Sequence, residues 1–241
     1  IDYGPFGFVE KYDPEWGMWI HSGQHFAFMN QPTAAGRNFR MFAESLIPLL
    51  DKAGAQEVAS VIRGYPALAS EALDKVWAFK LGLQHVGERT TALWREMEKL
   101  MRKHPTDYTI LWRQLTELVE VGDEDASSLE TLLPAFYDPP PAGLQQEWRA
   151  WLRGWRARLR ADGRDAAVVS AAMRQANPRY VPREELLVEA YEAAQRGDHS
   201  AVRALQELFR HPYEEQPSFG ERYYRRRAAG AERQGGVGFM S

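Results

Sequence analysis

The sequence contains no cysteine, and this absence excludes several kinds of chemistry at once. Without thiols the chain forms no disulfide, no thiolate zinc site and no cysteine nucleophile. No apolar run approaches the roughly 20 residues that a membrane-spanning helix needs. The net charge of −3 is small, so the composition indicates no nucleic acid or other polyanionic partner.

Helical periodicity is what the chain has in abundance, while no segment alternates as a strand would. From about residue 33 apolar side chains recur at steps of three and four, as in Phe39, Phe42 and Leu46, which places them on one helix face. Residues 1–32 are rich in glycine, proline and aromatics and predict no regular structure. After about Ser218 the periodicity is lost among arginines and glycines, which predicts a flexible tail over 218–241. We therefore expect a mainly α protein.

Prolines and glycines predict where the helices end. Pro48 should end or bend the first helix, and His104-Pro105 should stop a later one. Gly64 and Pro66 predict a break between a helix over 57–62 and another over 67–81.

Tryptophans at helical spacing form one conspicuous stripe. Trp148, Trp151 and Trp155 share a helix face, and the arginines at 149, 153, 156 and 160 lie away from it. A basic amphipathic helix on a membrane or on RNA is one interpretation. Burial of the tryptophans in a core, with the arginines in water, is the interpretation that we favour, because each tryptophan carries a large apolar area.

The start of the chain carries the most specific motif. Asp2-Tyr3-Gly4-Pro5-Phe6-Gly7-Phe8 is similar to the Asp-Phe-Gly element of protein kinases, in which the aspartate holds the metal that bridges the ATP phosphates. With the motifs that follow in order, it resembles the selenoprotein O family of kinase-like (pseudokinase) proteins. Those motifs are Glu10-Lys11-Tyr12-Asp13-Pro14, Asn30-Gln31-Pro32, Lys80-Leu81-Gly82-Leu83, Asp107-Tyr108-Thr109, Asn177-Pro178-Arg179-Tyr180-Val181, Ala193-Ala194-Gln195-Arg196-Gly197-Asp198 and Pro212-Tyr213-Glu214-Glu215-Gln216-Pro217.

The resemblance implies a particular part of a kinase-like fold. Residues 1–32 would be an activation-segment-like region with the metal-binding motif. Residues 33–217 would be a helical kinase-like C-lobe with family-specific C-terminal helices. In such folds the Asp-Phe-Gly element follows the N-terminal lobe and the catalytic loop, and the first residue here is Ile1 rather than methionine. We therefore expect a C-terminal piece of a longer protein, in which the N-terminal lobe and the catalytic loop are missing.

The resemblance also implies an activity. Members of the family transfer AMP from ATP to Ser, Thr or Tyr hydroxyls of proteins. Asp2 would bind Mg²⁺ or Mn²⁺ and, through the metal, ATP. The catalytic base would lie upstream, so no catalytic residue is expected within this chain, and the chain alone should be inactive. The protein would be cytoplasmic if bacterial, which we favour, and mitochondrial if eukaryotic. Phe239 departs from the family, since many members carry selenocysteine or cysteine third from the C-terminus.

Two other functions stay open at this point. The helical body could be a non-catalytic scaffold or interaction module, or the protein could be a phosphotransferase of the kinase type. An Asp-Asn catalytic loop shortly before Asp2 would favour the enzyme, and its absence would favour the scaffold.

Other titratable residues carry weaker signals. We expect Glu10, Asp13 and Glu15, close after the metal motif, to have surface roles. His21 and His25 are four residues apart, a spacing that can present two imidazoles to a metal on one helix face. Because Gly23 lies between them, a helix is doubtful, and we favour ordinary hydrogen bonding. The remaining histidines are scattered and predict no site.

Overall fold

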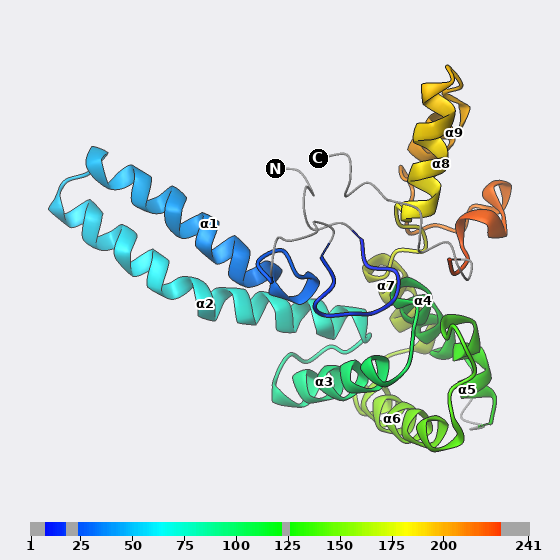
Figure 1. Ribbon diagram of the computed structural model, residues 1–241. Helices are drawn as coiled ribbons and strands as arrows, with labels where there is room; N and C mark the ends of the chain where they lie inside the picture. The colour runs from blue at the N-terminus through cyan, green and yellow to red at the C-terminus, as the bar shows by residue number, and fades with distance from the viewer. Residues whose placement is uncertain (1–7, 18–23, 122–125, 228–241) are drawn as a thin grey trace. The chain divides into compact units, whose positions relative to one another are not determined.

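The computed structural model describes residues 8–17, 24–121 and 126–227 and is mainly helical (Figure 1). No β-strand forms within those ranges, where extended backbone pairs only at the isolated bridges Lys11↔Asp107 and Thr106↔Phe136. The helices are α1 Gln31–Leu46, α2 Lys52–Lys80, α3 Glu88–Lys103, α4 Tyr108–Leu118, α5 Ala126–Leu132, α6 Ala142–Ala161, α7 Ala166–Ala176, α8 Glu184–Gln195 and α9 Ser200–Leu208.

The chain divides into two compact units, one of residues 1–7 and 13–75 and the other of residues 8–12 and 76–241. None of the helices that the structure describes is both long and apolar enough to cross a bilayer.

A hairpin of α1 and α2 dominates the first unit (Figure 1). The Tyr65 ring stacks on Phe39 with centroids 5.6 Å apart, and its hydroxyl donates to the Pro32 carbonyl at 3.0 Å. Gly36 makes room for this ring, because a Cβ there would lie 2.7 Å from a Tyr65 ring carbon. As predicted, α1 ends at Leu46 before Pro48, which sits in the 3-10 turn Ile47–Leu49.

The predicted break between residues 62 and 67 is wrong, because α2 runs without interruption from Lys52 to Lys80 with Pro66 inside it. Proline removes one backbone donor and crowds the preceding turn, at a cost of about 3 kcal/mol in a helix interior. Intact helical turns on both sides and the anchorage of Tyr65 to α1 offset that cost here. Local breaker residues alone therefore gave the wrong boundary.

An aromatic core fills the second unit. The rings of Trp77 and Trp94 stack with centroids 3.7 Å apart, and Trp112 lies 6.0 Å from Trp94. Helix α6 packs beside α3 and contributes Trp148, Trp151 and Trp155, which are all buried. Two of these indoles also satisfy their polar atom, donating to the carbonyls of Leu93 at 2.9 Å and Leu81 at 2.8 Å. The predicted burial of the tryptophan stripe is confirmed.

One arginine of α6 departs from the expectation that all of them lie in water. Arg156 is 8% exposed, and its guanidinium donates to the Leu118 carbonyl at 3.1 Å. It follows the buried Leu152 by one turn, or about 40° around the helix axis, so it lies on the same face as the tryptophans. The position of Arg156 along the helix therefore buries this side chain in spite of its charge.

Helices α8 and α9 form a second hairpin over a small core. Gly197 has φ +86° and ends α8 in the left-handed conformation that glycine adopts without strain. The core contains Tyr180, Leu186, Ala190, Leu205 and Leu208, and Phe219, Tyr223 and Tyr224 pack against it. Residues 218–227 thus differ from the flexible tail expected over 218–241, because aromatic side chains outside any periodic pattern cover this core. Residues 228–241 lie outside the described residues.

Trp151→Ala should lower the free energy of unfolding by about 3–5 kcal/mol, because it removes a buried indole and leaves a cavity. Urea unfolding followed by circular dichroism measures the change. Arg153→Ala, on the exposed side of the same helix, is the control and should cost less than about 0.5 kcal/mol. Equal effects of the two substitutions would contradict the assignment of Trp151 to the core.

Candidate functional site

The predicted metal ligand Asp2 lies outside the described residues, but residues 8–12, a few positions further along the chain, are fixed in place. Val9 and Tyr12 are buried. The Tyr12 N–H donates to the Thr106 carbonyl at 2.8 Å, and the Tyr108 N–H donates to the Glu10 carbonyl at 2.9 Å. Residues 8–12 are therefore held as an extended segment against the loop that leads into α4.

A buried cluster of three charges anchors this segment. Arg183, directly before α8, donates to both carboxylate oxygens of Asp107, at 2.7 and 3.1 Å, and to Glu10 Oε2 at 3.3 Å. Side-chain exposure is 2% for Arg183, 0% for Asp107 and 10% for Glu10. The expectation of a surface role for Glu10 is therefore wrong. Its partner lies 173 positions away, and a contact at that separation leaves no local pattern.

The cluster has clear electrostatic consequences. Burial raises the pKa of Glu10 above its ordinary value, although the charge of Arg183 opposes this rise. Burial alone would lower the pKa of Arg183. The charge and hydrogen bonds of Asp107 outweigh this effect, and the net result is a pKa above the usual range of an arginine. Asp107 also accepts the Ile110 N–H at 2.9 Å and so caps α4. Arg183 thus compensates two carboxylates whose burial would otherwise be costly.

A lysine sits beside this region in an unusual environment. The Lys80 ammonium lies 4.7 Å from the centroid of the Trp112 ring and 5.9 Å from that of Tyr108. It reaches the Ala176 carbonyl at 3.5 Å, and the Lys80 carbonyl accepts the Asn177 amide at 3.0 Å. Burial lowers the pKa of Lys80 to about 7, although the aromatic faces favour the charged form.

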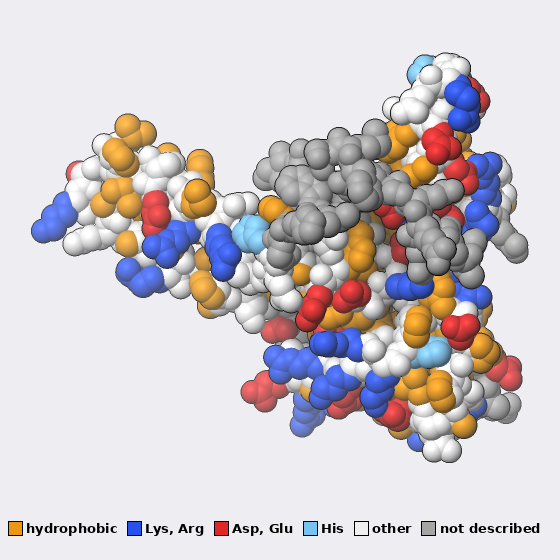
Figure 2. Space-filling model, in the orientation of Figure 1, with side chains coloured by type: hydrophobic (Ala, Val, Ile, Leu, Met, Phe, Trp, Pro, Cys, Tyr) orange, Lys and Arg blue, Asp and Glu red, His pale blue; other side chains and the backbone are white. Residues whose placement is uncertain are grey.

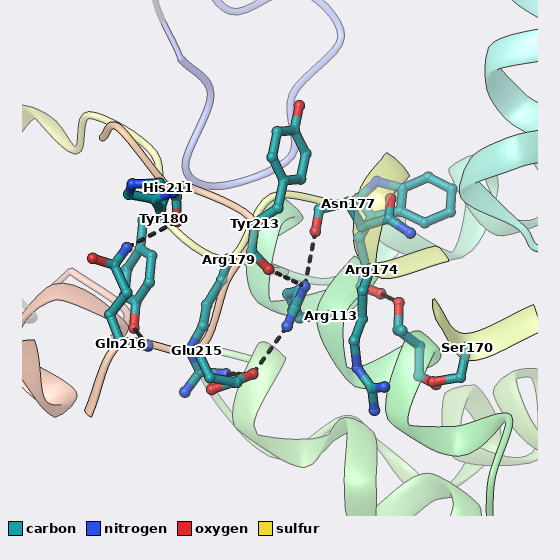
Figure 3. Close-up of polar contacts among 12 residues, drawn as sticks. Arg113, Ser170, Arg174, Asn177, Arg179, Tyr180, His211, Tyr213, Glu215 and Gln216 are labelled. Atoms are coloured by element: carbon teal, nitrogen blue, oxygen red, sulfur yellow. Dashed lines mark hydrogen bonds and ion pairs between the residues drawn. The ribbon is translucent and has the colours of Figure 1, made fainter. Parts of the chain in front are cut away.

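A second buried cation, Arg113, joins the C-terminal motifs (Figure 3). Its guanidinium donates to the carbonyls of Asn177 and Tyr213, both at 3.2 Å, and to Glu215 at 2.9 Å. Arg179 also donates to Glu215, at 3.1 Å. The side chains in Figure 3 come from α4, from α7 and from two loops, around residues 177–180 and 211–216. Arg113 and Glu215 hold the two loops together.

The segments that carry the family resemblance therefore contact one another in the second unit. Lys80 touches Tyr108 and Asn177, and Arg179 pairs with Glu215. These contacts join the motifs to one another through hydrogen bonds, an ion pair and a cation–aromatic contact. Among the described residues no three His, Asp or Glu side chains group as a metal site would.

The other sequence candidates have ordinary environments. His21 lies outside the described residues, and His25 Nδ1 contacts the Arg37 guanidinium at 3.3 Å, which agrees with hydrogen bonding. Asp13 is exposed and accepts the Glu15 N–H at 2.9 Å, and Glu15 is exposed as well. The surface role expected for these two carboxylates is confirmed.

Comparison with known proteins decides the family. The family model described as "Protein adenylyltransferase SelO" matches residues 1–210. The chain belongs to the SelO family. The protein nucleotidyltransferase YdiU of Aromatoleum aromaticum is 31% identical over the whole chain, and that of Xanthomonas campestris pv. campestris is 36% identical over 90% of it. These matches cover 45% and 41% of the two relatives, so this SelO-family chain spans less than half of their length.

The sequence alone did not indicate the polar groups that hold residues 8–12 in place. The motifs containing Glu10, Lys80 and Asp107 carried the resemblance to the SelO family, but nothing in them indicated a role for these side chains. Arg183 lies in none of the quoted motifs. The partners of Glu10, Lys80 and Asp107 lie at the end of α7 and directly before α8, and they come into contact only in the folded chain.

Arg183→Met should cost about 3–5 kcal/mol of unfolding free energy, since it leaves two buried carboxylates without their cation. Urea denaturation at neutral pH measures the loss. Arg210→Met removes the exposed pair with Glu207, at 3.0 Å, and is the matched control with an expected cost of about 0–1 kcal/mol. A loss for Arg183→Met no larger than that of the control would show that the cluster contributes little.

Lys80 should make stability rise with pH between about 7 and 10. The unfolded lysine binds its proton up to a pKa of about 10.4, whereas the folded lysine releases it near 7. Because the unfolded state then binds more protons, the free energy of unfolding increases with pH in this window. Urea unfolding at pH 7, 8 and 9 measures the slope.

Lys80→Met should flatten this rise. Lys75→Met, which removes only an exposed pair with Glu71, should keep the wild-type slope. A wild-type slope in Lys80→Met would show that the aromatic contacts restore an ordinary pKa.

Proposed function

We propose that this chain forms the C-terminal part of a protein adenylyltransferase that transfers AMP from ATP to Ser, Thr or Tyr hydroxyls. The observation that carries the proposal is the SelO family match over residues 1–210, which includes the Asp-Tyr-Gly-Pro-Phe-Gly motif at the start. A kinase-like C-lobe over 33–217, preceded by an activation-segment-like region over 1–32, is part of the same proposal. So is a cytoplasmic location, which the bacterial relatives favour.

In the proposed reaction an acceptor hydroxyl oxygen attacks the α-phosphorus of ATP. A bond forms between that oxygen and phosphorus, pyrophosphate leaves, and the hydroxyl proton passes to a base that lies outside this chain. Asp2 would hold Mg²⁺ or Mn²⁺, whose charge offsets that of the phosphates. A carboxylate oxygen suits such a hard cation.

The described residues contribute position to this proposal. The backbone from Val9 to Tyr12 begins seven residues after Asp2, and the buried Arg183 cluster fixes it. A metal ligand gains from a rigid support, because a displacement of about 1 Å can cost on the order of a hundredfold in rate. We propose that Glu10, Asp107 and Arg183 are positioning residues for the Asp2 segment.

The scaffold alternative loses its main motivation in the structure. The tryptophan stripe of α6, which the sequence offers as a possible binding surface, is buried. A phosphotransferase remains an outcome of the test below, because it differs only in which phosphorus is attacked.

Asp2→Ala in the longer protein that this chain would complete should abolish AMP transfer without unfolding the protein. Asp2→Asn should also be severe, because it removes the negative charge that Mg²⁺ needs. A loss of about 4 kcal/mol of transition-state stabilisation lowers the rate about a thousandfold. Intact-mass spectrometry of an acceptor protein incubated with ATP and Mg²⁺ or Mn²⁺ detects the transfer.

Asp13→Ala is the matched control, since Asp13 is exposed in the same part of the chain and should leave the rate unchanged. The 241-residue chain alone should transfer nothing. Transfer of AMP at the normal rate by Asp2→Ala would refute the metal-ligand role. Addition of phosphate by the wild type would replace the adenylyltransferase with a kinase-type enzyme.

A further inference from the structure

The hairpin of α1 and α2 exposes several large apolar side chains, more than the surface of a monomeric soluble protein usually does. Exposed fractions reach 63% for Phe42, 81% for Leu49, 50% for Val61 and 65% for Leu68. Figure 2 shows hydrophobic side chains gathered towards the end of this hairpin. Contiguous patches of this kind mark interaction sites.

Three of these side chains lie on one flank of the hairpin, and Leu49 lies in the 3-10 turn beyond α1. Phe42 precedes the buried Ala43 by one residue, so it points about 100° to one side of it. On α2, Leu68 and Val61 precede the half-buried Ala69 by one and eight residues. Their side chains are therefore rotated about 100° and 80° around the helix axis from Ala69, in the same direction as Phe42 is rotated from Ala43. In an antiparallel pair, equal rotations away from the contact line reach the same flank. We call Phe42, Val61 and Leu68 the apolar flank.

The opposite flank is charged. Arg40 and Glu44 pair there at 2.7 Å, and Arg37 and Arg63 lie on the same side by the same geometry. Segregation of this kind is typical of a helix pair that is covered on its apolar side and solvated on the other.

The hairpin itself contains little core. In α1 the buried residues are Ala34 and Ala43, and in α2 none is buried before Trp77. Most apolar side chains of the hairpin are at best half-buried, so apolar burial offsets less of the conformational entropy of ordering it than in a well-packed helix pair. A partner that covers the apolar flank permanently would supply the missing burial.

Three observations indicate which partner this is. The relatives extend over more than twice the length of the match, so more than half of each lies outside the aligned region. The charged side chains of α1, namely Arg37, Arg40 and Glu44, all lie on the opposite flank, so the α1 half of the apolar flank is poor in charge, as permanent interfaces are. On α2, Gly64 lies between Val61 and Leu68 with nothing within 4 Å of the place where its Cβ would be, so a helix backbone could approach closely.

We propose that the apolar flank is the docking surface for a helix from the part of the longer polypeptide that lies outside this chain. The proposal rests on the proposed function in one respect, namely that the chain completes a longer SelO-family protein. It adds the surface on which the two parts of that protein meet.

Site-specific photo-crosslinking in the longer protein tests the contact. A benzoylphenylalanine at position 68 should cross-link to a peptide outside the 241 residues of this chain, in a product with the mass of one molecule. The same probe at position 63, on the charged flank, is the control and should give no such product. A cross-link to residues 76–241, a cross-linked dimer or the absence of any product from position 68 would each overturn the proposal.

Hydrogen exchange provides a second measurement that does not depend on the probe. Leu68→Glu should increase exchange on the order of tenfold in the contacted peptide, because the local opening becomes easier. Arg63→Glu should leave that exchange unchanged. AMP transfer by the wild type is measured in parallel. Absent transfer with an intact cross-link would refute the proposed function but not the docking surface, and the reverse result would refute only the docking surface.

Discussion

The guanidinium of Arg183 is the group on which the arrangement of the second unit most depends. It is almost fully buried and donates to both Asp107 and Glu10. A buried cation is tolerated only when carboxylates surround it with good geometry, and here Asp107 binds it in a bidentate manner. Since Asp107 caps α4 and the Glu10 carbonyl accepts the Tyr108 N–H, one side chain ties together three distant segments.

Two other cations follow the same principle with different partners. Lys80 has aromatic faces and a carbonyl around its ammonium, and Arg113 has two carbonyls and Glu215. Cations placed this way specify which loops meet, because an alternative packing would leave a charge without a partner. In the second unit the family motifs are therefore joined through buried cations.

The two units differ in how much they stabilise themselves. The second unit has a core of stacked tryptophans, and the indole N–H groups of Trp151 and Trp155 donate to backbone carbonyls. The first unit relies on the contact of Tyr65 with Phe39 and Pro32 and on a few alanines. The second unit therefore has a core of its own, whereas few side chains of the α1–α2 hairpin are fully buried.

Periodicity, breakers and motifs in the sequence determined the helical class, the burial of the α6 tryptophans, the end of α1 before Pro48 and the family. These features depend on neighbours within a turn or two, or on short strings of residues, so they can be read locally. Tertiary structure decided the rest. It carried α2 through Pro66, buried Arg156, packed Phe219 and Tyr224 onto the α8–α9 core, and placed Glu10 against Arg183. Each of these outcomes depends on contacts between residues far apart in the chain, whose energies outweigh the local preferences.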